Sequence, residues 1–257
     1  MVVVNYSITE LIISSKELTQ LPDDIDKYIN LKILDCDDNQ ITSLDNLPPT
    51  LEKLYCSNNQ ISSLDNLPPS LKELWCCCNK LTSLDNLPIK LEYLNCRENQ
   101  ITSLDNLPPK LEVLYCSSNQ ITTLDNLPNG IKDGHEDNSL SLGLPLTLKF
   151  LNCSLNKITS LNNLPSTIKE LWCFSNNLTS LDNLPPTLIE LICDDNQISS
   201  LDNLPPTLEV LICSDNKITS LDNLPPTLKE LECKDNPLIY DFKPTLENIR
   251  NYNASIL

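Results

Sequence analysis

The chain has 257 residues, of which 40% are hydrophobic and 5% aromatic, so an ordered core must be built mainly from aliphatic side chains. A formal net charge of −17 argues against nucleic acid as the main ligand and against anionic membranes, because both require cationic protein surfaces. The same charge permits electrostatic steering of a basic protein partner, and it is also consistent with a surface charged only for solubility.

A unit of twenty residues recurs along most of the chain. Leu51 to Ser70 reads LEKLYCSNNQISSLDNLPPS, and the next twenty residues follow the same pattern. We write the pattern as L-x-x-L-x-C-x-x-N-x-I/L-x-x-L-D-N-L-P-P-T and number its positions one to twenty. A fixed period of this length indicates a solenoid, because one coil cannot bury its own apolar face whereas stacked coils can.

Each unit has two halves with different expected backbones. Apolar residues at positions four and six alternate with variable ones at three and five, which predicts a short strand with one buried face. Proline at positions eighteen and nineteen lacks the backbone donor that a strand ladder needs. The second half is therefore expected to be a polyproline-like or irregular return path.

The pattern L-x-x-L-x-C-x-x-N-x-I/L resembles the leucine-rich repeat consensus over nearly the whole chain. Its ending, L-D-N-L-P-P, is similar to the short repeats of bacterial effector proteins and to Asn- and Pro-rich repeats in proteins of large DNA viruses. The resemblance implies an α/β-type, mostly β solenoid: a horseshoe with a concave parallel sheet and an irregular convex side. It also implies a pathogen-encoded product, viral in one reading, that binds proteins inside a host cell.

The chain departs from the effector repeats in two respects. Asp stands at position fifteen, whereas the effector repeats usually have Pro after position fourteen. The ubiquitin-ligase domain that some effectors carry has no counterpart in these residues, so that activity does not transfer.

We interpret residues 1–257 as a single solenoid with five parts. Residues 1–30 form an N-terminal capping repeat whose first residues, MVVV, are too short for a signal peptide or membrane helix and are expected to be an edge strand. Residues 31–130 are five regular repeats, 131–147 a degenerate repeat and 148–227 four regular repeats. Residues 228–257 are a half-repeat and a cap, with a helix predicted from Pro244 to Tyr252 and Thr245 as its N-cap.

The segment from Ile131 to Thr147 has seventeen residues where twenty are expected. Its strand half lacks the leucine and cysteine pattern, and the single histidine, His135, lies there. We expect a damaged repeat tolerated as a surface loop, with a weak joint on either side. A binding loop or hinge is the alternative.

Position nine carries a polar side chain that we expect to face inward. Position nine is Asn: Asn39, Asn59, Asn79, Asn99, Asn119, Asn156, Asn176, Asn196, Asn216 and Asn236. Because a buried amide needs partners, we expect it to bond backbone groups coil after coil.

Position six is Cys in ten coils: Cys36, Cys56, Cys76, Cys96, Cys116, Cys153, Cys173, Cys193, Cys213 and Cys233. We expect these thiols to be free core residues, because a row of parallel side chains is poor disulfide geometry. No C-x-x-C pair suggests zinc. Free core thiols favour an intracellular, reducing compartment, the host cytoplasm if a pathogen encodes the protein. Cys77 and Cys78 are expected to be exposed.

Aspartate recurs at position fifteen: Asp45, Asp65, Asp85, Asp105, Asp125, Asp182, Asp202 and Asp222. We expect each carboxylate to accept backbone donors of its own turn. Calcium bound along the row is the alternative.

The variable strand positions indicate the surface that could bind a partner. We predict a partner-binding face made of Tyr55, Trp75, Tyr93, Tyr115, Phe150, Trp172, Phe174, Ile192 and Ile212. We predict an acidic rim made of Asp37, Asp38, Asp194, Asp195, Asp215 and Asp235. Exposed aromatic clusters usually mark interaction surfaces, although parallel sheets also favour such residues.

Enzymatic motifs are absent from the sequence: it contains no Gly-rich phosphate loop, G-x-S-x-G or H-E-x-x-H. We therefore predict a monomeric, non-catalytic scaffold that binds a protein partner and needs no cofactor or metal. A purely structural repeat protein, such as a particle component, is one alternative. A substrate adaptor for a separate enzyme is the other.

Overall fold

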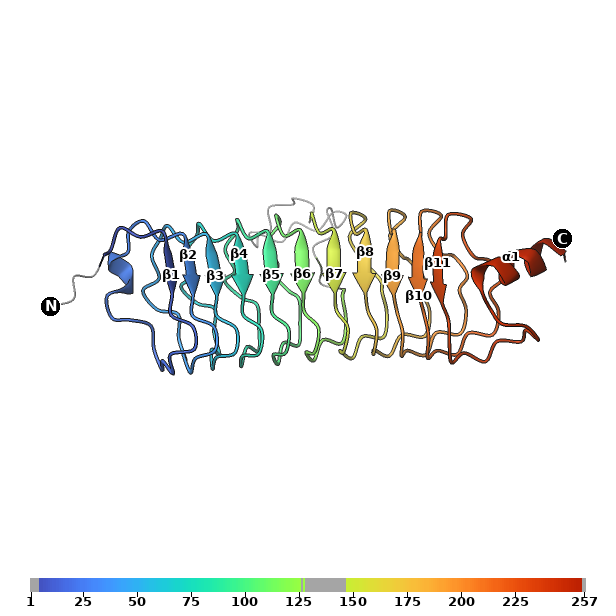
Figure 1. Ribbon diagram of the computed structural model, residues 1–257, viewed down its shortest axis with the longest axis horizontal. Helices are drawn as coiled ribbons and strands as arrows, with labels where there is room; N and C mark the ends of the chain where they lie inside the picture. The colour runs from blue at the N-terminus through green and yellow to red at the C-terminus, as the bar shows by residue number, and fades with distance from the viewer. Residues whose placement is uncertain (1–4, 126, 128–146, 256–257) are drawn as a thin grey trace, which may run out of the picture.

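The computed structural model describes residues 5–125, 127 and 147–255. Eleven short parallel strands form one sheet in which neighbours along the chain are neighbours in space (Figure 1). The strands are β1 (Glu10–Ile12), β2 (Ile33–Asp35), β3 (Lys53–Tyr55), β4 (Glu73–Trp75), β5 (Tyr93–Asn95), β6 (Val113–Tyr115), β7 (Phe150–Asn152), β8 (Glu170–Trp172), β9 (Glu190–Ile192), β10 (Val210–Ile212) and β11 (Glu230–Glu232). The predicted solenoid with a parallel sheet is confirmed.

Each strand occupies positions three to five of its coil, and the register keeps equal positions side by side. Leu54 pairs with Leu34 on one side and with Leu74 on the other, and all three are fully buried. Positions four and six therefore face the core, while positions three and five face outward on what we call the strand face. Leucine and isoleucine at positions one, eleven and fourteen complete the core of each regular coil.

The return half of each regular coil is irregular, as expected. Asparagine at position sixteen has a left-handed backbone in several coils, with φ of 65° at Asn66 and 63° at Asn86. Asparagine tolerates this conformation better than most residues. Proline at position eighteen is buried and its carbonyl accepts from position one, as in the 3.2 Å bond from Leu51 N to Pro48 O.

The asparagine at position nine joins neighbouring coils, which confirms its predicted structural role. Asn119 Nδ2 donates to the carbonyls of Cys116 and Ser117 in its own coil and to Cys96 O in the preceding coil. Its Oδ1 accepts from Ile101 N at 2.9 Å. Equivalent bonds recur from Asn39 to Asn236, so all of these amides have backbone partners.

The ten cysteines at position six are free and buried, as predicted. Burial raises the pKa of Cys96 to about 12, so its thiol stays protonated at neutral pH. Cys77 and Cys78 are half-buried rather than exposed. Burial and the hydrogen bond to Glu98 raise the pKa of Cys78 to about 12, so this thiol stays protonated at neutral pH.

The coil stack is continuous across the irregular segment. β6 pairs directly with β7 in the usual register, Leu114 opposite Leu151. Asn156 Oδ1 accepts from Ile121 N at 3.0 Å, which is the standard inter-coil bond. β6 and β7 are therefore direct neighbours in the sheet, and one direct pairing of coils stands where two weak joints were expected. Of the segment itself only Thr147 is described; His135 and the loop or hinge alternatives lie outside the described residues.

Two different caps close the stack. At the N-terminal end lies the short 3₁₀ helix η1 (Ile25–Lys27), and Tyr6 packs edge-on against Tyr28, with ring centroids 5.1 Å apart. The MVVV segment lies outside the described residues. At the other end, α1 (Leu246–Ser255) begins after Thr245, whose hydroxyl accepts from Asn248 N at 3.2 Å as an N-cap. Among the described helices, none has the length and apolar character needed to span a membrane.

Candidate functional site

Six rings form a continuous aromatic row on the strand face, from β3 to β8. Consecutive ring centroids lie 4.7 to 6.0 Å apart, and the most nearly parallel pair is Trp75 and Tyr93, with centroids 5.2 Å apart and an interplanar angle of 15°. We call the following residues the aromatic row: Tyr55, Trp75, Tyr93, Tyr115, Phe150 and Trp172. All six side chains are half-buried, so each ring keeps one part in contact with solvent. The structure thus brings together six of the nine residues predicted for the partner-binding face.

The row alternates between two strand positions. Four rings come from position five, but Tyr93 and Phe150 come from position three. In those two coils position five is an asparagine, Asn95 or Asn152, which is buried and accepts the backbone N–H two residues later. Asparagine is smaller than an aromatic side chain, so we interpret the two asparagines as making room for the rings beside them.

The row also crosses the junction between β6 and β7. Tyr115 and Phe150 lie 4.7 Å apart, although 34 residues separate them in the chain. The aromatic row is therefore continuous across the junction between β6 and β7. Sequence spacing alone could not show this, because a full coil between them would have separated the two rings.

Two glutamates anchor the tryptophans at opposite ends of the row. Glu73 Oε1 accepts from Trp75 Nε1 at 2.9 Å and from Tyr55 OH at 3.2 Å. Glu73 Oε2 pairs with Lys53 Nζ at 2.6 Å. Burial opposes ionisation of Glu73, but hydrogen bonds from Lys53 and Trp75 outweigh it and hold its pKa below the usual value. At the other end, Glu190 Oε1 accepts from Trp172 Nε1 at 2.8 Å.

The remaining predicted face residues extend the apolar surface beyond the row. Ile192 is the register partner of Trp172, and Ile212 is the partner of Ile192, so both continue position five across β9 and β10. Phe174 lies at position seven, beyond the end of β8, and is half-buried. It therefore borders the strand face and does not join the row.

The predicted acidic rim contains two kinds of aspartate. Asp38, Asp195, Asp215 and Asp235 are exposed at position eight, where the backbone is left-handed. Asp37 and Asp194 are half-buried, and each accepts the backbone N–H of the next coil, from Ser57 and Ser214. Burial raises the pKa of Asp37 to about 6 and raises that of Asp194 as well. These two side chains thus contribute to coil stacking, which the sequence pattern did not reveal.

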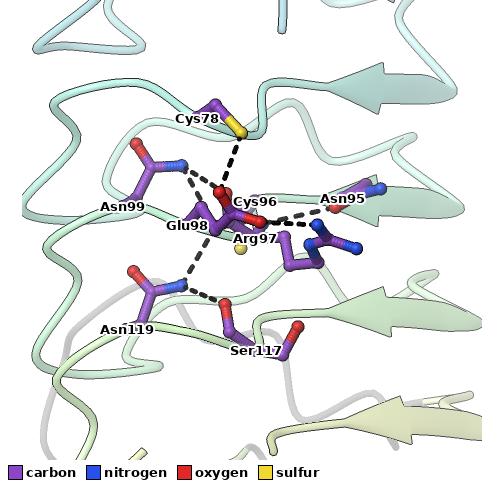
Figure 2. Close-up of polar contacts among 8 residues, drawn as sticks. All are labelled: Cys78, Asn95, Cys96, Arg97, Glu98, Asn99, Ser117 and Asn119. Carbon is purple, nitrogen blue, oxygen red and sulfur yellow. Dashed lines mark hydrogen bonds and ion pairs between the residues drawn. The ribbon is translucent and has the colours of Figure 1, made fainter. Parts of the chain in front are cut away.

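Polar contacts also connect coils at the edge where the chain leaves the sheet. Figure 2 shows Glu98 accepting from the Cys78 thiol at 3.3 Å and from Arg97 at 2.5 Å, beside the amides of Asn99 and Asn119. Arg97 is therefore neutralised within its own coil.

Four aspartates of the return path, Asp65, Asp85, Asp125 and Asp202, accept a side-chain amide of the next coil, which corrects the expected turn geometry. Asp65 Oδ1 accepts from Asn86 Nδ2 at 2.8 Å, and Asp202 Oδ1 accepts from Asn223 Nδ2 at 2.9 Å. The turn itself is held by the hydroxyl at position thirteen, as when Ser103 Oγ accepts from Asp105 N. Hydrogen bonds from Ser63 and Asn86 hold the pKa of Asp65 below its usual value. Within the described residues, no three His, Cys, Asp or Glu side chains cluster as metal ligands would.

Comparison with known proteins identifies the architecture. The family model described as leucine-rich repeats (two copies) matches residues 49–88 and 89–129. The leucine-rich effector protein YopM from Yersinia pestis is 30% identical over 90% of this chain and 73% of its own, with a TM-score of 0.58. This chain belongs to the leucine-rich repeat proteins.

Other leucine-rich repeat structures are similar over most of this chain. YopM from Yersinia enterocolitica is 34% identical, covering 85% of this chain and 53% of its own, with a TM-score of 0.57. The functional domain of InlJ from Listeria monocytogenes, described as including a cysteine ladder, is 33% identical over 91% of this chain and 50% of its own, with a TM-score of 0.73. The chain thus spans about half the length of these two structures. Among curated proteins, no relative matches.

Proposed function

We propose that this leucine-rich repeat protein is a non-catalytic scaffold that binds a protein partner on its strand face. The observation that carries the proposal is the aromatic row, a run of half-buried rings on a preformed sheet. Aromatic anchors contribute most of the binding energy in many interfaces, and a preformed surface loses little entropy when it binds. Leucine-rich repeat proteins are typically interaction scaffolds without enzymatic activity.

The partner we propose is basic, and the scaffold acts as a monomer that binds neither nucleic acid nor membranes. The net charge of −17 supports each point, because it attracts a basic partner and repels like-charged copies, phosphates and anionic lipids. The exposed aspartates at position eight would steer a basic partner toward the strand face.

We place the protein inside a cell, in a reducing compartment. Twelve free cysteines, ten of them buried in a row, support this location because oxidising compartments favour disulfides. Similarity to YopM, described as an effector protein, supports a pathogen-encoded product that acts in a host cell. A viral origin is the narrower form of the same proposal, and it rests on the Asn- and Pro-rich repeat ending.

Site-specific photo-crosslinking tests the proposed face. A photoreactive phenylalanine analogue would replace Tyr115 or Phe150 on the strand face, and Thr122 on the exposed return path as the matched control. We expect the two strand-face positions to crosslink the same partner in the native context and Thr122 to crosslink none. Crosslinks confined to Thr122, or no crosslinked protein at any position, would instead favour a structural role.

A further inference from the structure

The two tryptophan–glutamate pairs of the aromatic row differ in one respect. Both tryptophans donate their indole N–H to a glutamate, Trp75 to Glu73 and Trp172 to Glu190. Glu73 also has a cation, because its register partner in β3 is Lys53 and the two form an ion pair. Among the described residues, Glu190 has no such ion pair.

The surroundings of Glu190 explain why it lacks a cation. Its register partner in β8 is Glu170, and its partner in β10 is Val210. Like charges placed side by side in a sheet destabilise it. At other places neighbouring coils put opposite charges together, as in the ion pairs of Lys53 with Glu73 and of Lys229 with Glu209. The pair Glu170 and Glu190 is thus an unbalanced charge next to an exposed part of Trp172.

The apolar surface around this charge continues in both directions. Phe150 contacts Trp172 at 5.2 Å on one side, and Ile192 follows Trp172 in the register on the other. Neutralising Glu170 and Glu190 requires a cation, and the rings favour one with a planar face. Guanidinium satisfies both, since it stacks on aromatic rings and pairs with carboxylates through two parallel hydrogen bonds, which ammonium cannot do.

We infer that the strand face docks an extended, arginine-bearing segment of a protein partner, with a guanidinium over Trp172 that pairs with Glu190 and Glu170. This inference rests on the proposed function and names the chemistry of the partner. The row runs across six strands, or roughly 24 Å at the usual strand spacing, and an extended segment of about seven or eight residues spans that length. A second copy of this chain does not fit, because its own acidic face would be repelled.

A peptide titration tests this inference on the full-length protein. The probe is a nine-residue peptide of alternating arginine and serine, capped at both ends, followed by calorimetry and by tryptophan fluorescence at physiological salt. The chain has only Trp75 and Trp172, so Trp75→Phe isolates the signal of Trp172. We expect saturable binding that changes the Trp172 signal, and binding several-fold weaker for the matching lysine peptide.

Three substitutions decide whether the binding is local. Glu190→Gln should weaken binding about tenfold, because it removes the charge but keeps an acceptor for Trp172 Nε1. The control Glu209→Gln removes an equal charge from a neighbouring strand edge that is already paired with Lys229, and it should change affinity less than twofold. Lys53→Gln frees Glu73 beside Trp75 and should tighten binding. Each variant must keep the melting temperature and circular dichroism of the parent.

Several results would overturn the inference. Equal weakening by Glu190→Gln and Glu209→Gln would mean diffuse attraction to an acidic protein, and no binding at millimolar peptide would mean that the face takes another chemistry. The crosslinking experiment separates this failure from failure of the proposed function. A partner crosslinked through Tyr115 by a segment without arginine leaves the proposed function intact and rejects the guanidinium site, whereas no strand-face crosslink rejects both.

Discussion

At the scale of single residues, the amide at position nine links each coil to the one before it. We expect Asn119→Ala to lower the free energy of unfolding by about 1–3 kcal/mol, because one buried backbone N–H loses its only acceptor and three buried carbonyls lose one of their donors. Ile101 N–H loses its acceptor, Asn119 Oδ1. The carbonyls of Cys96, Cys116 and Ser117 each lose one donor but keep another, from Asn99, Asn156 and Glu98 respectively. Chemical denaturation measures the loss. Gln120→Ala is the control, since Gln120 is exposed next to Asn119, and it should change stability little. Equal effects of the two variants would contradict the role of the amide.

The half-buried carboxyl of Asp37 predicts an unusual dependence of stability on pH. Its pKa is raised to about 6 when folded, above the ordinary value near 3.8, so the folded state binds the proton more tightly than the unfolded state. This group therefore stabilises the fold below about pH 4, and that contribution is lost as pH rises through about 6. Asp37→Asn, which keeps an acceptor for Ser57 N, should be more stable than the parent at pH 7, and the difference should shrink toward pH 4.

Thermal melts of the two proteins from pH 4 to pH 7.5 check this expectation. Asp38→Asn is the matched control, because Asp38 is exposed one residue away. A stability gain of equal size in both variants would mean that general charge repulsion, rather than burial of Asp37, sets the pH dependence.

Asn119 and Asp37 show which contacts of single residues can be predicted from the sequence and which cannot. The pattern predicted the partners of Asn119, because an inward amide at a fixed position requires backbone donors and acceptors. It did not predict those of Asp37. Position seven varies from coil to coil, so nothing in the repeat shows that its carboxylate reaches the N–H of Ser57.

At the scale of elements, the twenty-residue period located the strands and the face on which the rings lie. The period did not predict that the rings of the row come from two different strand positions. Tyr93 and Phe150 enter the row from position three because positions three and five share one face, and the choice depends on side-chain packing against Asn95 or Asn152. Such packing is decided between coils, so it cannot be derived from any single repeat.

We expect the aspartates of the return path not to bind calcium. Four of its aspartates accept side-chain amides of the next coil, as Asp65 does from Asn86, and these bonds offset the repulsion between stacked carboxylates. We expect millimolar calcium to leave the melting temperature unchanged within about 1 °C, since an ion that binds the folded state would raise it. Magnesium at the same concentration is the control for ionic strength. A rise specific to calcium, lost in Asp65→Asn with Asp85→Asn, would show a cation site along this row.

At the scale of the whole molecule, stability is a sum of coil terms and interfaces between neighbouring coils. The sequence suggested a degenerate repeat between residues 130 and 148, and hence two weakened interfaces. The structure shows one ordinary interface there, because β6 pairs with β7 and Asn156 bonds Ile121. A seventeen-residue departure from the period could be a shortened coil or an insertion, and only the spatial pairing distinguishes the two.

A deletion tests whether residues 130–146 are an insertion. Removing them leaves Asn129 at position nineteen and Thr147 at position twenty, so that Leu148 follows after a coil of twenty residues. Thr147 Oγ1 already donates to Leu111 O at 3.2 Å, the bond that this position makes in regular coils such as that of Thr227 with Leu208. The interface between β6 and β7 loses nothing that is described. We expect the deletion variant to fold with an unchanged circular dichroism spectrum. Its melting temperature should stay the same or rise slightly, because a shorter connection costs less entropy to close. The amides of β6 and β7 should be equally protected in hydrogen exchange. The matched control removes residues 91–110, which form a complete coil, and so it shortens the stack and deletes Tyr93 from the aromatic row. A large loss of stability on removing 130–146, or fast exchange confined to β6 and β7, would show that the segment completes an interface and is part of the solenoid.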